Sequence, residues 1–159
     1  MENKQPITTT LNRIRAHSPC TEGWTKLLAY LGKTHADDEP LPFSVILASN
    51  GLDDALWCCR AEPQHAKEWR LFAVWCARQV QHLMADPRSI AALDVAERYA
   101  NGAATDDELT AARGAAWAAA GAAAWDAAGV AAGAAARGAA RGAAGAAQKV
   151  EFLRVVTGD

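Results

Sequence analysis

A run of paired alanines in the C-terminal part of the chain constrains its fold more than any other feature of the sequence. Residues 111–146 form nine consecutive tetrads, and every tetrad begins with two alanines. The third tetrad position holds Arg, Gly or Trp, and the two tryptophans are Trp117 and Trp125. Because alanine is the best helix former and is depleted in strands, the repeat predicts helix.

The four-residue period of this repeat does not match the 3.6-residue turn of an α-helix. At about 100° per residue, the alanine stripe moves about 40° around the helix with each tetrad. One straight helix over the whole repeat would be about 54 Å long and would overhang a compact domain of this size. We therefore expect either a break into two helices around Gly129–Gly133 or other helices that cover a changing face. The small side chains also predict unusually close helix–helix crossings.

Helix signals recur in the mixed sequence before the repeat, where apolar residues at helical spacing lie between caps, glycines and prolines. Thr105 and Glu108 have the spacing of a capping box that begins the repeat helix. The helix over 64–85 has the widest apolar face and is expected to be covered on more than one side. The predicted helices before the repeat are residues 11–15, 21–31, 43–49, 52–61, 64–85 and 88–100.

The predicted fold class is all-α: a compact multi-helix bundle with an Ala/Gly-rich tetrad-repeat segment that breaks into two helices. A length of 159 residues favours a single domain over residues 1–159. Within that domain we expect mixed-sequence helices over 7–104, repeat helices over 105–148 and a C-terminal helix over 149–157. Apolar residues of the C-terminal helix are expected to close the core.

The charge balance argues against nucleic acid and membrane as partners. Sixteen Lys and Arg against eighteen Asp and Glu give a net charge of −2, and the basic residues are scattered. Nucleic-acid binders usually show a basic excess or stripe. The repeat contains charged residues such as Arg113 and Asp126, which are costly in a bilayer. The polar N-terminal residues have no apolar signal segment, which predicts a cytoplasmic location.

The cysteine and histidine spacings match no zinc site, and no familiar catalytic motif is present. We therefore expect no metal, no cofactor and no enzymatic activity, with the cysteines reduced. Two other classes stay open. A helical enzyme or ligand-binding bundle would show a pocket with a Cys–His pair or converging carboxylates, and a structural phage or cell component would self-assemble. The four cysteines are Cys20, Cys58, Cys59 and Cys76.

Several segments in order resemble a known family. They are Cys20–Trp24, Leu52–Trp57, Leu71–Ala73 leading to Arg78–Val80, and Asp86–Ala92, followed by the tetrads. Over residues 18–157 the chain is similar to the small helical immunity proteins of bacterial polymorphic-toxin systems, specifically the fifth immunity family and its phage-borne relatives. It departs from them in having glycine at many tetrad positions and in its loop at 33–41. The resemblance implies an all-helical protein that acts by binding and has no catalytic residue.

The predicted function is therefore non-enzymatic inhibition of a partner toxin or nuclease by direct binding. The alternative is a phage-encoded anti-defence protein, similar in role to an anti-CRISPR, that binds a host nuclease complex. Acidic residues are candidate contacts because many toxins and nucleases have basic active sites. The alternative interpretation is that these residues only lie in solvated loops and at helix N-termini. Trp117 and Trp125 are either interface anchors or gap fillers between alanine helices, and the alanine faces allow a homodimer. The acidic candidates are Asp37, Asp38, Glu39, Asp53 and Asp54.

Overall fold

The described part of the chain is almost entirely helical. The computed structural model describes residues 5–127 and 134–158, while the side chains of 119–127 and 134–144 lie outside the description. Within these residues the chain forms eight α-helices, three short 3-10 helices and one sheet of two two-residue strands. The predicted all-α fold class is confirmed.

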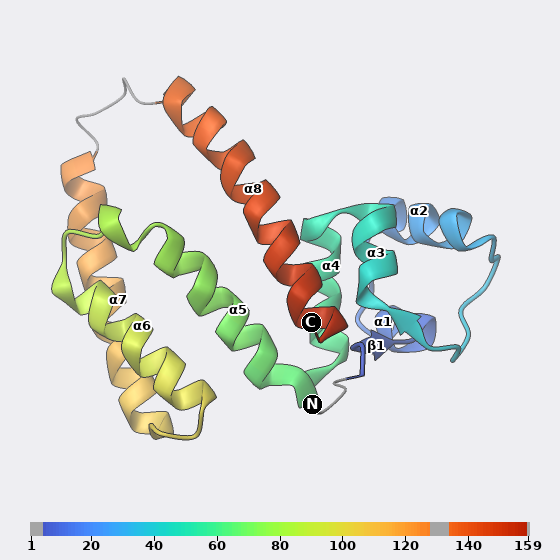
Figure 1. Ribbon diagram of the computed structural model, residues 1–159, viewed down its shortest axis with the longest axis horizontal. Helices are drawn as coiled ribbons and strands as arrows, with labels where there is room; N and C mark the ends of the chain where they lie inside the picture. The colour runs from blue at the N-terminus through green and yellow to red at the C-terminus, as the bar shows by residue number, and fades with distance from the viewer. Residues whose placement is uncertain (1–4, 128–133, 159) are drawn as a thin grey trace. The chain divides into compact units, whose positions relative to one another are not determined.

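The chain divides into two units, and each is described by itself. Unit 1 comprises Met1–His65 and Ala147–Asp159, and unit 2 comprises Ala66–Ala146. The prediction that residues 1–159 form a single domain stays a prediction. In unit 1 the elements are β1 (Thr8–Thr9), α1 (Leu11–Arg15), α2 (Thr21–Leu31), β2 (Leu41–Pro42), α3 (Phe43–Asn50), α4 (Leu52–Cys58) and the 3-10 helices η1 (Cys59–Ala61) and η2 (Pro63–His65). Figure 1 shows these elements with those of unit 2, which are α5 (Ala66–Gln79), the 3-10 helix η3 (Gln81–Leu83), α6 (Pro87–Ala100) and α7 (Asp106–Ala127); α8 (Ala134–Thr157) begins in unit 2 and ends in unit 1.

The core of unit 1 joins the two ends of the sequence. Phe43 at the start of α3 meets Phe152 of α8 edge to face, with ring centroids 6.3 Å apart, and both side chains are fully buried. The backbone N–H of Ile7 donates to the carbonyl of Val156 at 2.7 Å. The apolar C-terminal residues therefore close this core, as expected. They form the last turns of α8, a helix that begins within the repeat.

Local signals set the helix boundaries that position the site. Thr10 caps α1 by accepting the Arg13 N–H, and Gly32 ends α2 in the left-handed conformation at φ 65°. Pro42 precedes α3, and Gly51 separates α3 from α4 with φ 94°. The predicted starts of these helices are confirmed, because each depends on neighbouring residues alone.

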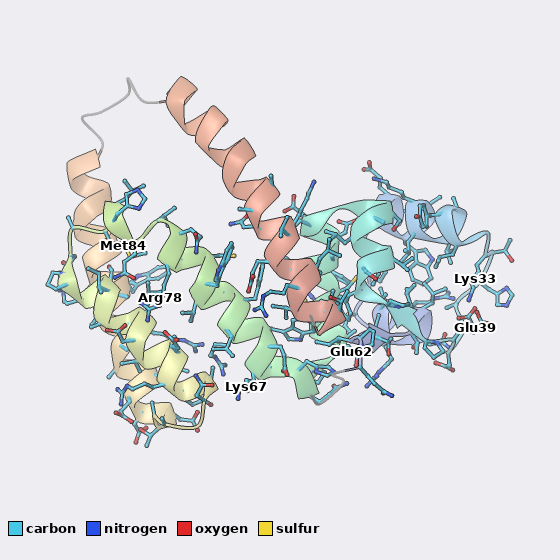
Figure 2. The ribbon with its side chains drawn as sticks, viewed as in Figure 1. Lys33, Glu39, Glu62, Lys67, Arg78 and Met84 are labelled. Carbon is cyan, nitrogen blue, oxygen red and sulfur yellow. The ribbon has the colours of Figure 1, made fainter. Side chains whose placement is uncertain are left out.

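In unit 2, α5, α6 and α7 pack side by side, and Arg78 joins the first two (Figure 2). Its guanidinium donates to Glu97 at 2.6 Å and to Asp94 at 2.8 Å, and these carboxylates raise the pKa of Arg78. The predicted capping box is confirmed. The Thr105 N–H donates to Glu108 at 2.7 Å, and the Glu108 N–H donates to the Thr105 hydroxyl at 3.2 Å.

The predicted helix over residues 64–85 is too long, because α5 ends at Gln79. Val80 leaves the helix at φ −112° and ψ 10°, and Met84 is extended. The chain must straighten there to reach Asp86, whose carboxylate caps α6 by accepting the Arg88 N–H at 2.9 Å. The expected broad coverage also fails at this end, since Val80 and Leu83 are 41% and 72% exposed.

The repeat is described as α7 and α8. The expected break at Gly129–Gly133 lies outside the described residues. The side chains around most glycines of the repeat also lie outside the description. At Gly114 and Gly145 the predicted close helix crossing is not found, because an added Cβ would meet no atom of the described part of the chain within 4 Å at either position.

Candidate functional site

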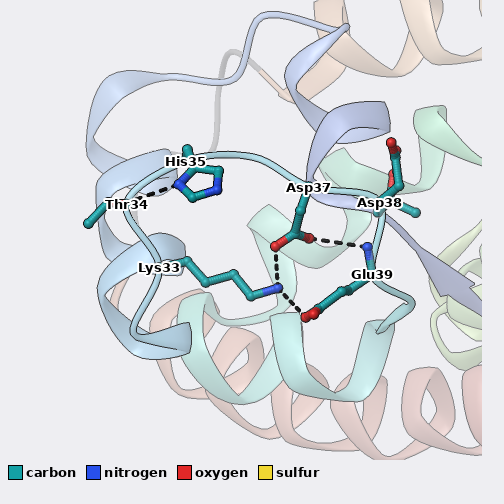
Figure 3. A network of polar contacts seen from close by, with 7 residues as sticks. Lys33, Thr34, His35, Asp37, Asp38 and Glu39 are labelled. Carbon is teal, nitrogen blue, oxygen red and sulfur yellow. Dashed lines mark hydrogen bonds and ion pairs between the residues drawn. The ribbon is translucent and has the colours of Figure 1, made fainter.

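In the acidic loop after α2, two carboxylates form ion pairs with a lysine of the same loop. Lys33 Nζ lies 2.5 Å from a carboxylate oxygen of Asp37 and 2.5 Å from one of Glu39 (Figure 3). The Glu39 N–H also donates to Asp37 at 3.2 Å. The contact with Lys33 lowers the pKa of Asp37 and raises the pKa of Lys33. Two of the three predicted acidic contacts in this loop are thus already paired internally.

Asp38 lies beside this network and does not join it. Its side chain points away from Lys33 in Figure 3 and accepts a weak hydrogen bond from the Thr10 hydroxyl at 3.4 Å. That contact attaches the loop to the residue that caps α1. Asp38 is therefore the one carboxylate of this group that Lys33 does not hold.

The second acidic pair begins α4 and has a different setting. Asp53 is exposed, whereas Asp54 is partly buried and accepts a hydrogen bond from Asn50 Nδ2 at 2.7 Å. The same Asn50 amide donates to the carbonyl of Gly23 on α2 at 2.8 Å, so it links three segments. Within the described residues neither Asp53 nor Asp54 forms an ion pair. The Asp54 carboxylate is held by a neutral amide and has no cationic side-chain partner among the described residues; we call it uncompensated in this sense.

The two acidic groups lie at opposite ends of α2. Asp54 meets α2 at Gly23, in its first turn, while Lys33 and its carboxylates follow its last residue. The 11 residues of α2 correspond to about 16 Å. The predicted acidic contacts therefore form two sites, not one patch.

An open cavity of about 160 Å³ lies where α2, α3 and α4 meet, and Asp54 lines it. Its wall is mostly apolar, with Ile14, Trp24, Leu27, Ile46 and Trp57 among the lining side chains. We call it the α2–α4 cavity. Sequence reasoning named Asp54 but missed Trp24, Asn50 and Trp57. The spacing of Asn50 and Asp54, four residues apart, was the available signal, but the cavity depends on contacts between distant segments.

The α2–α4 cavity is lined by parts of the segments Cys20–Trp24 and Leu52–Trp57. Cys20, Gly23 and Trp24 come from the first, and Asp54 and Trp57 come from the second. Gly23 fits closely, because an added Cβ would lie 2.8 Å from Asp54 Oδ2 and 3.2 Å from Cys20 Sγ.

Two cysteines, Cys20 and Cys58, also line the cavity. Cys20 is exposed and accepts the Gly23 N–H at 3.4 Å, whereas Cys58 is buried. Burial, with a smaller effect of Asp54, raises the pKa of Cys58 to about 12, and burial raises that of Cys59 to about 12. No histidine is among the described residues that line the cavity, and those residues include one carboxylate.

The structure describes the side chain of only one of the two tryptophans of the repeat. Trp117 is 83% exposed on α7, which is contrary to a gap-filling role. The side chain of Trp125 lies outside the described residues. Trp117 stays a candidate anchor on unit 2.

The chain matches no protein-family model, and comparisons with curated proteins and with solved structures find no significant match. Among the described helices, none has the length and apolar character needed to cross a membrane. The described residues also contain no group of three or more His, Cys, Asp or Glu side chains placed to hold a metal ion.

Proposed function

We propose that this chain is a non-enzymatic, immunity-like inhibitor that binds a basic partner protein, a toxin or a nuclease, through one face of unit 1. This face, the α2–α4 face, comprises the α2–α4 cavity with Asp54 and the exposed Asp53 that precedes Asp54 in the chain. The observation that carries the proposal is the uncompensated Asp54 carboxylate on the wall of an open apolar cavity.

Charge and shape together support a protein partner. Complementary charge steers association and selects partners, and an apolar pocket at the centre of an interface is where binding energy concentrates. The α2–α4 face offers both. The loop at Lys33–Glu39 offers less, because Lys33 holds Asp37 and Glu39 and leaves Asp38 as the one carboxylate of the loop outside this network.

The sequence resemblance agrees with this face, because the segments that carry it include cavity-lining residues. An immunity protein acts by occupying a toxin, and a toxin with a basic active site presents cations to such a face. The alternative, a phage-encoded anti-defence protein, uses the same kind of contact on a host nuclease complex.

The test is coexpression of the tagged chain with the products of neighbouring genes, read as copurification and as relief of toxicity. A variant with Asp53→Asn and Asp54→Asn removes two charges from the proposed face. Its matched control, Asp38→Asn with Glu39→Gln, removes two charges from the loop at the other end of α2.

We expect a basic neighbouring product to copurify with the wild type and the control, and to be lost from the Asp53/Asp54 variant. Binding should weaken as salt rises, because the contact is electrostatic. Equal capture by both variants would contradict the assignment of the face. No capture and no relief of toxicity with any neighbouring product would count against the immunity role, and capture of a host nuclease complex would support the alternative.

A further inference from the structure

The α2–α4 cavity has the size and the wall for one elongated side chain. Its volume is about 160 Å³, and a cavity of roughly 150 Å³ in another protein holds a benzene ring. Trp24 and Trp57 come from different helices, α2 and α4, and both line it together with Leu27 and Ile46. Such a wall suits the aliphatic stem of a long side chain.

The polar end of the cavity selects the charge of that side chain. Asp54 and Asn50 are the lining residues with a carboxylate and an amide. Both hydrogen atoms of an amide group can be donated, and Asn50 Nδ2 donates to Asp54 and to the Gly23 carbonyl. The amide thus fixes the carboxylate against the wall. A carboxylate accepts several hydrogen bonds, so Asp54 retains capacity for a cationic donor.

The indole of Trp57 already contacts a cation in this structure. The Arg60 guanidinium lies 4.2 Å from the ring centroid, and its Nε donates to the Trp57 carbonyl at 2.8 Å. Indole faces attract cations through the ring quadrupole. Arg60 is exposed and is not a lining residue.

We propose that the α2–α4 cavity is a receptor for one Lys or Arg side chain of the partner protein, with its stem between Trp24 and Trp57 and its cationic head on Asp54. This inference rests on the proposed function, because it names the group of the partner that enters the face. It excludes a neutral or acidic side chain as the preferred occupant.

The test uses blocked amino acids as probes: N-acetyl-lysine N-methylamide, its arginine counterpart, and the norleucine counterpart as a neutral control of similar length. Dissociation constants come from ligand-observed NMR titrations of the full chain. The wild type should bind the lysine and arginine probes about tenfold more tightly than the norleucine probe, as expected for a hydrogen bond to a charged group. The preference should shrink between low and high salt.

Asp54→Asn should reduce this preference to about onefold and leave the affinity for the norleucine probe within about twofold. Glu39→Gln, which removes one charge at the other end of α2, should keep the tenfold preference. Equal affinity of the wild type for all three probes would overturn the inference, and so would a preference that survives Asp54→Asn. The wild-type ratio alone decides the matter if the variant fails to fold.

These probes separate the inference from the proposed function. Partner capture that depends on Asp53 and Asp54, without any preference for cationic probes, would overturn the inference and leave the function standing. A cationic preference without a protein partner would leave the cavity assignment standing and overturn the function.

Discussion

The loop at the C-terminal end of α2 and the cavity at its N-terminal end carry the same chemical group in opposite settings. In the loop, Lys33 pairs with Asp37 and Glu39. In the cavity, Asp54 is held by the neutral Asn50 amide beside two tryptophans. The comparison teaches that the counter-ion, more than the number of acidic residues, decides which carboxylate is available to a partner.

The largest expected effect comes from opening the core of unit 1, the unit that contains both regions. Phe152→Ala deletes a fully buried ring that packs edge to face on Phe43. Such a truncation costs about 3–5 kcal/mol of the free energy of unfolding. Denaturant melts followed by circular dichroism should show that loss, and NMR should show the loop and the cavity changing together. A loss below about 1 kcal/mol, or a change confined to one region, would contradict this view of unit 1.

A smaller effect tests how tightly the cavity is built. Gly23→Ala and Gly114→Ala make the same change in two helices, and each gains up to about 1 kcal/mol of helix propensity. At Gly114 the new methyl group meets nothing within 4 Å, so we expect the variant to be more stable by about that amount. At Gly23 it would meet Asp54 Oδ2 at 2.8 Å and should cancel the gain and displace the carboxylate.

Thermal and denaturant melts of the two variants measure this difference. The Gly23→Ala variant should also lose the preference for cationic probes, whereas the Gly114→Ala variant should keep it. Equal stabilisation of both variants, with binding unchanged, would show that the Gly23–Asp54 contact does not shape the cavity.

The smallest effect concerns the loop and is read as a titration. Contact with Lys33 lowers the pKa of Asp37 below its ordinary value near 3.8. A carboxyl whose pKa is lowered in the folded state contributes stability above its ordinary pKa, and that contribution is lost as the pH falls through the folded value. Because Lys33→Met removes the ammonium group that contacts Asp37, the pKa of Asp37 should return toward its ordinary value.

Carbon-detected NMR of the Asp37 carboxyl checks this shift. Asp86 serves as the internal control, because Arg88 lowers its pKa to about 2 independently of Lys33. A pKa of Asp37 that is the same in the variant and the wild type would show that Lys33 does not compensate the loop in solution.

Features set by neighbouring residues could be read from the sequence. The all-α class, the end of α2 before Gly32 and the Thr105–Glu108 capping box all depend on contacts within a few residues. The end of α5 could not be read, because the apolar spacing continues through Val80 and Leu83 after the backbone has left the helix.

The candidate site could be predicted only in part. Asp53 and Asp54 stood out as an acidic pair in the sequence. The partner that fixes Asp54, Asn50, also binds Gly23, and Gly23 is 27 residues from Asn50 in the chain. The pairing of Lys33 with Asp37 and Glu39 depends on how the loop folds back, which no helical or strand periodicity encodes. The acidic residues in the sequence located both carboxylate groups. Only the folded structure showed that a lysine pairs with one group and a neutral amide holds the other.

The measurement that tests the central claim most directly is one titration of the isotope-labelled chain with N-acetyl-lysine N-methylamide, followed in nitrogen–proton correlation spectra. If the uncompensated carboxylate is the receptor, the Trp24 and Trp57 indole signals and the Asn50 side-chain amide will shift with one common dissociation constant, while Lys33 to Glu39 will not move. Shifts concentrated at Lys33 to Glu39, with the cavity signals unmoved, would contradict the account.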